Sequence, residues 1–161
     1  MGTAGAGTVK RAVTAEKFKG KERSTLVIPA PQGVDADRLV IIGLGNEEEQ
    51  AKADNVRLGG VIASVLGTGS SASILMEGPS KWRADAEAAA DIALGLRLRH
   101  YRFDKYKAKK REAGDGDKAD TPVSVTIHVD DPNGAKRAIR SRDAVGSGVV
   151  LARDLVNEPP N

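Results

Sequence analysis

The sequence has no cysteine and few aromatic residues. It can therefore form no disulfide and no thiolate metal site, which fits a reducing compartment. Residues 1–8 are rich in glycine and alanine and lack the apolar core of a signal peptide. No apolar run approaches the roughly 20 residues that a membrane-spanning helix needs. We therefore expect a soluble cytoplasmic protein without a membrane partner.

Histidine is also scarce, and this limits the chemistry of the chain. His100 and His128 lie far apart in sequence, and each stands without a neighbouring ligand. A zinc site normally needs three or four close ligands, and a nucleophilic triad needs a base near serine or cysteine. No Gly-x-Ser-x-Gly elbow occurs. We therefore predict no catalytic residue and no metal ligand in this chain.

The apolar residues are mainly alanine, valine, leucine and isoleucine, and their pattern predicts strands. The apolar runs at 25–28, 38–43 and 72–76 are typical of strands. The run at 38–43 is continuous, as in a parallel sheet covered on both faces. Residues 123–129 alternate between apolar and polar, which predicts a strand with one exposed face.

Helices are predicted between these strands, over 47–66, 83–99 and 133–155. Asp131 and Pro132 mark the start of the last helix, as a capping side chain followed by proline. The alternation of strands and helices predicts an α/β sandwich with a parallel or mixed sheet. The residues of the last helix that are expected to face the core are Ala135, Ala138, Ile139, Val145, Val149 and Ala152.

A glycine pair follows the second strand, where a nucleotide could bind. Gly43 and Gly45 resemble the start of a dinucleotide loop, but Glu48 occupies the position of the third glycine. Glu47, Glu48 and Glu49 would satisfy the start of the next helix and repel a phosphate. A nucleotide or ADP-ribose site is therefore the weakest of the alternatives.

The segment 97–111 is strongly basic and contains interleaved aromatic residues. Such a pattern can bind nucleic acid, because aromatic rings stack on bases while cations hold phosphates. The simpler alternative is a solvated helix end that its aromatic residues anchor. The candidate contact residues for a nucleic acid or another partner are Arg97, Arg99, Arg102, Lys105, Lys107, Lys109, Lys110 and Arg111.

Four stretches in order resemble the N-terminal domain of the leucyl aminopeptidase family. They are residues 18–21, 39–48, 101–107 and 151–161, and the last contains Asn157-Glu158-Pro159-Pro160-Asn161. The resemblance implies a three-layer α/β sandwich with a macro-domain-like mixed sheet and flanking helices. It further implies an N-terminal domain at 1–131, without the family's first strand, and a linker helix at 132–161. Its junction residues would be Asn157, Pro159, Pro160 and Asn161.

The same resemblance implies a function for a longer protein. The full-length enzyme would remove N-terminal amino acids from peptides, leucine favoured, with two divalent cations, manganese or zinc. It would assemble as a homo-hexamer, and its metal ligands would follow Asn161 in a catalytic domain. This chain alone would then be an inactive monomer whose partner is that catalytic domain. Because some family members bind DNA, weak DNA binding is the alternative role.

Overall fold

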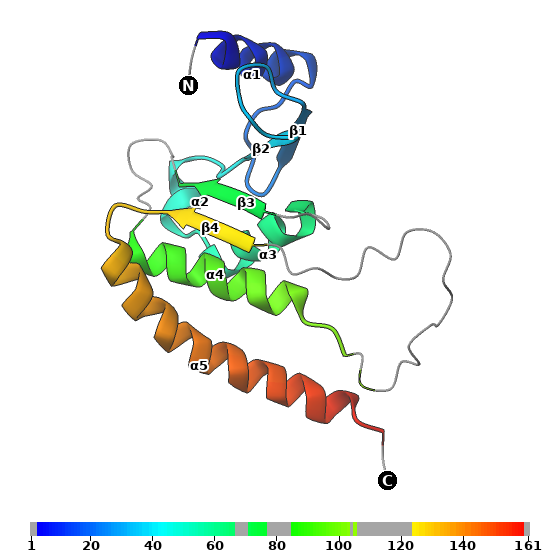
Figure 1. Cartoon of the computed structure of the whole chain (residues 1–161), viewed down its shortest axis with the longest axis vertical. Helices are drawn as coiled ribbons and strands as arrows, with labels where there is room; N and C mark the ends of the chain where they lie inside the picture. The colour runs from blue at the N-terminus through cyan, green and yellow to red at the C-terminus, as the bar shows by residue number, and fades with distance from the viewer. Residues whose placement is uncertain (1–2, 67–70, 77–84, 104, 106–123, 160–161) are drawn as a thin grey trace. The chain divides into compact units, whose positions relative to one another are not determined.

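The computed structural model describes residues 3–66, 71–76, 85–103, 105 and 124–159 (Figure 1). These residues form two compact units. The first holds the described residues up to Ala53, and the second holds those from Asp54 onward. Both units combine helices with one small sheet each.

The first unit contains α1 (Thr3–Ala15), β1 (Thr25–Pro29), β2 (Arg38–Ile42) and α2 (Glu47–Ala51). Strands β1 and β2 pair antiparallel, and Val27 lies opposite Val40. Alternate residues of β1, Leu26 and Ile28, are buried. The parallel pairing suggested by the apolar run is wrong here. Residues 30–37 are too short a connection for the crossover that parallel strands require.

The second unit contains α3 (Asn55–Leu66), β3 (Ser71–Leu75), α4 (Ala86–His100), β4 (Ser124–His128) and α5 (Pro132–Asn157). Strands β3 and β4 pair parallel, and Ser73 lies opposite Thr126. Both strands alternate between exposed and half-buried residues. The predicted one-sided strand at 123–129 is thereby confirmed over its described part.

Helix α4 packs between α3 and α5 and forms the core of the second unit (Figure 1). This position explains its alanine-rich sequence, because small residues let neighbouring helices approach closely. At the crossing with α3, a Cβ at Gly59 would collide with the carbonyl oxygen of Ile92, and one at Gly95 with that of Val56. The buried residues of α4 are Ala88, Ala89, Ala90, Ile92, Leu94, Gly95 and Leu96.

The helix predicted over 47–66 is two helices, which corrects the sequence interpretation. Helix α2 ends at Ala51, and α3 begins at Asn55. The side chain of Asp54 accepts a 2.9 Å hydrogen bond from the backbone N–H of Arg57. Such a bond satisfies a free N–H at a helix start, so Asp54 favours a new helix over continuation.

Helix α5 begins where the sequence predicts. The Asp131 carboxylate accepts a hydrogen bond from the Gly134 N–H at 2.9 Å, and Pro132 occupies the first turn. Ala135 and Ala138 are buried as expected, and Ile139 and Val149 are half-buried. Val145 and Ala152 are exposed, so their predicted core positions are wrong. The described helices include none with the length and apolarity to cross a bilayer.

Helices flanking small sheets with both parallel and antiparallel pairs confirm the predicted α/β class with mixed strand pairing. Helix α1 precedes the strands and helices that the apolar pattern predicts. The division into an N-terminal domain at 1–131 and a linker helix at 132–161 stays a prediction.

Candidate functional site

The glycine loop after β2 is held by the backbone of residues 20–24. The Gly45 N–H donates to the Gly20 carbonyl at 3.0 Å, and the Gly43 N–H donates to the Ser24 carbonyl at 2.8 Å. Gly45 has a φ of 77°, which glycine adopts without the steric cost of a side chain. A Cβ at Gly43 would collide with the backbone of Gly20 and Lys21. These glycines therefore serve a close chain crossing, and their N–H groups already have acceptors.

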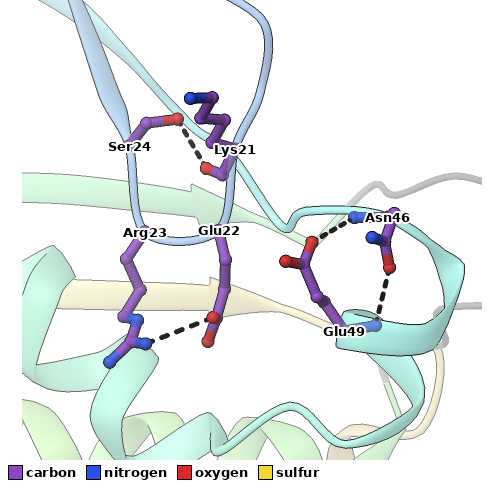
Figure 2. A network of polar contacts seen from close by, with 6 residues as sticks. All are labelled: Lys21, Glu22, Arg23, Ser24, Asn46 and Glu49. Carbon is purple, nitrogen blue, oxygen red and sulfur yellow. Dashed lines mark hydrogen bonds and ion pairs between the residues drawn. The ribbon is translucent and has the colours of Figure 1, made fainter.

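The start of α2 is closed by a reciprocal capping box (Figure 2). The Glu49 N–H donates to Asn46 Oδ1 at 2.9 Å, and the Asn46 N–H donates to Glu49 Oε2 at 2.6 Å. A bound phosphate would have to displace the Glu49 carboxylate, which already occupies the positive helix end. The expectation that acidic residues satisfy this helix start is met through Glu49.

The side chains drawn in the turn beside this box make local polar contacts (Figure 2). The Ser24 hydroxyl donates to the Lys21 carbonyl at 2.5 Å, and Arg23 pairs with its neighbour Glu22 at 3.1 Å. An exposed ion pair of this kind stabilises little. Within the described residues, no group of three histidine, aspartate or glutamate side chains could hold a metal ion.

The basic segment begins with Arg97, whose guanidinium contacts α5. Its Nη1 lies 3.1 Å from the Asp143 carboxylate, and its Nη2 donates to the Ser147 hydroxyl at 3.1 Å. Nη1 also lies 3.2 Å from the Asp143 carbonyl oxygen. Arg97 therefore joins α4 to α5, which is a structural use of a residue predicted as a nucleic-acid contact.

Tyr101 follows α4 and fixes this chain end to α5. Its hydroxyl donates to Asp154 Oδ1 at 2.6 Å. The Arg153 guanidinium lies 5.5 Å from the centre of the tyrosine ring and donates to the Leu98 carbonyl at 2.8 Å. Desolvation, followed by the hydrogen bond to Asp154, raises the pKa of Tyr101 above its ordinary value. Tyr101 thus acts as an anchor in the described structure.

Lys105 continues the same pattern, because its ammonium pairs with the Glu158 carboxylate just after α5. Arg99 and Arg102 are exposed. The other predicted contacts, Lys107, Lys109, Lys110 and Arg111, lie outside the described residues. The structure therefore brings Arg97, Tyr101 and Lys105 to acidic residues of the C-terminal region, a partnership that the sequence analysis did not predict.

The predicted junction residues are described in part. The side-chain amide of Asn157 donates to the Arg153 carbonyl at 2.8 Å in the last turn of α5. Pro159 is exposed. Pro160 and Asn161 lie outside the described residues.

Arg142 is a further α4–α5 link that the sequence interpretation omitted. Its Nε donates to Asp91 at 2.8 Å, and its Nη2 lies 2.7 Å from Glu87. The hydrogen bond to Asp91 is the main reason that the pKa of Arg142 is raised. The available sequence signal for this link was the spacing of Glu87 and Asp91, which places two carboxylates one helical turn apart on the same face.

Comparison with known sequences gives a consistent family. Residues 3–110 match the model of the cytosol aminopeptidase family, N-terminal domain. A probable cytosol aminopeptidase of Methylorubrum extorquens is 50% identical over the whole chain, and one of Methylorubrum populi is 51% identical. The chain spans 31% of the length of each of these relatives.

Solved structures show a similar fold. A tomato leucine aminopeptidase mutant aligns with a TM-score of 0.68 and 21% identity, over 96% of this chain and 29% of that one. The bottromycin maturation enzyme BotP in complex with Mn aligns with a TM-score of 0.64 and 22% identity, over 91% of this chain and 29% of that one. At this identity the likeness extends to the fold alone.

Proposed function

The chain belongs to the cytosol aminopeptidase family and matches its N-terminal domain, and from this we propose that it is the non-catalytic domain of a leucyl aminopeptidase. The family match carries the proposal. The polar links between α4 and α5 supply a stiff connection on which a following domain could be held.

The full-length enzyme, in this proposal, removes N-terminal amino acids, with leucine favoured, from peptides in the cytoplasm. Two divalent cations, manganese or zinc, would supply Lewis-acid chemistry for this hydrolysis, and their ligands would come from the catalytic domain. The Mn named for BotP supports the choice of metal. Both cations belong to the catalytic domain, which also supplies the contacts of a homo-hexamer. The isolated chain is then a monomer.

A direct assay tests the proposal. The purified chain should not hydrolyse leucine amide with manganese or zinc present. A fusion of this chain to the remaining two thirds of the Methylorubrum extorquens relative should hydrolyse it, and a chelator should abolish that activity. Metal-dependent turnover by the chain alone, or a fully inactive folded fusion, would contradict the proposal. Light scattering of the isolated chain should give the monomer mass, and a hexamer would count against it.

The alternative, a nucleic-acid-binding module, has less support. Arg97 and Lys105 are already paired with Asp143 and Glu158. A cation that binds a carboxylate loses part of its attraction for a phosphate. The alternative therefore depends mainly on residues beyond those pairs.

A further inference from the structure

The last turns of α5 have an unusual distribution of polarity. Between Ala144 and Val156, the sequence has only two charged residues, Arg153 and Asp154. Both contact the α4 end, because Arg153 donates to the Leu98 carbonyl and Asp154 accepts from Tyr101. The charged groups of this stretch are therefore used in a contact within the chain. A surface helix usually makes such a contact through its apolar residues and turns its charged residues to solvent.

The large apolar side chains of the same stretch remain in water. Val145 is 54% exposed and Leu151 is 60% exposed, while Leu155 reaches 67% and Val156 reaches 84%. Ala152, between them, is also exposed. Residues 145, 152 and 156 recur at helical spacing, and 151 and 155 follow one turn apart, so they form one broad face. We call these five residues the α5 apolar face.

Such a face is costly in a free protein. Isolated exposed aliphatic residues are ordinary, but a contiguous exposed apolar surface normally marks a protein contact. The charged residues of the stretch point to α4, so they do not shield the apolar residues from solvent. The distribution is that of a helix covered on a second side by another protein surface.

We propose that the α5 apolar face is the docking surface for the catalytic domain of the same polypeptide, covered by an uncharged aliphatic or aromatic surface of that domain. The inference rests on the proposed function. The larger part of each cytosol aminopeptidase relative lies outside its match to this chain. The face reaches Val156, immediately before the chain leaves α5 at Glu158.

Tethering favours this occupant over a second copy of the chain. A domain that follows after a short linker is present at a high effective concentration beside Leu155 and Val156. Pro159 and Pro160 stiffen the connection and reduce the conformations that it can sample. A free copy at micromolar concentration has no such advantage.

The absence of cysteine provides a direct test. Leu155→Cys places a thiol on the apolar face, and Arg140→Cys places the matched control at an exposed position on the same helix. Maleimide labelling is followed by peptide mass spectrometry in the isolated chain and in the fusion to the rest of the Methylorubrum extorquens relative. Leucine amide hydrolysis is measured on the same samples.

In the isolated chain, both thiols should react at similar rates at every protein concentration. In the fusion, position 155 should react roughly tenfold or more slowly than position 140, because labelling then requires opening of the interface. Equal rates in an active fusion would overturn the docking surface while leaving the proposed function intact. Protection of position 155 in the isolated chain also overturns the docking surface. Protection that rises with protein concentration would show that a second copy covers the face. Protection that is independent of concentration would show that this chain covers its own face.

Discussion

The hydroxyl of Tyr101 donates a 2.6 Å hydrogen bond to Asp154, which joins the residue after α4 to the last turns of α5. The two residues are far apart in sequence, so this contact closes a long loop of chain. Arg153 reinforces it from the side, with its guanidinium 5.5 Å from the ring centre. Tyr101, one of the aromatic residues in the basic segment, thus has a clear structural role.

Replacement of Tyr101 should lower thermal stability. Tyr101→Phe removes the hydrogen bond but keeps the ring beside Arg153, so the unfolding midpoint should fall by a few degrees. Tyr101→Ala removes the ring as well and should cause a larger fall. Circular dichroism melts measure both changes. An unchanged midpoint in Tyr101→Ala would show that the contact does not hold α4 to α5 in solution.

The raised pKa of Tyr101 gives a pH dependence with a definite sign. The folded-state pKa lies above the unfolded value of 10.0. The stabilisation is therefore complete below the unfolded pKa and is lost as pH rises through the folded pKa. The difference in stability between the wild type and Tyr101→Phe should be constant at neutral pH and shrink in strongly alkaline solution. Denaturant unfolding at both pH values measures it, and a difference that grows with pH would refute the assignment.

Where α3 crosses α4, position 59 should tolerate no residue larger than glycine. Gly59→Ala places a methyl group against the Ile92 carbonyl, and the resulting strain should cost roughly 1–3 kcal/mol of unfolding free energy. Gly60→Ala is the matched control, because nothing lies within 4 Å of its added Cβ. That variant should gain about 0.5–1 kcal/mol from helix propensity. Urea unfolding compares them, and equal effects would rule out the close crossing.

The capping box of α2 should exclude nucleotides. Asn46→Ala removes the acceptor of the Glu49 N–H and should cost roughly 1 kcal/mol in urea unfolding. Calorimetry with ADP-ribose should detect no binding to the wild type, because Glu49 occupies the helix start where a pyrophosphate would bind. Saturable ADP-ribose binding that a bulky residue at Gly45 abolishes would contradict this.

Sequence patterns predicted the order of the four described strands. They also predicted the start of α5, because the signals of Asp131 and Pro132 are local. The inner face of α5 was harder to predict. Its C-terminal half is apolar on several sides, so helical spacing cannot decide which side packs against α4. Val145 and Ala152 therefore appeared to be core residues. The partners of Arg97 and Tyr101 depend on the packing of α4 on α5, which no short motif encodes.

The basic segment 97–111 provides the last prediction, on DNA. If it binds, the interaction should be sequence-tolerant and of order 10⁻⁴ to 10⁻⁶ M at physiological salt. Because Arg97 and Lys105 are paired with acids, we expect roughly three to five phosphate contacts, each adding about −0.9 to the log–log salt slope.

Triple replacement of Lys107, Lys109 and Lys110 with glutamine should flatten that slope. Each phosphate contact that is lost lowers the number of counterions released on binding. The matched control removes the same charge from α5, through glutamine at the exposed positions Lys136, Arg137 and Arg140. A shift assay with duplex DNA at low salt compares the variants. Loss of binding in the first variant alone would support a nucleic-acid surface at the basic segment. Equal loss in both would indicate only general charge attraction, and no binding by the wild type would leave the segment as a helix end anchored through Tyr101.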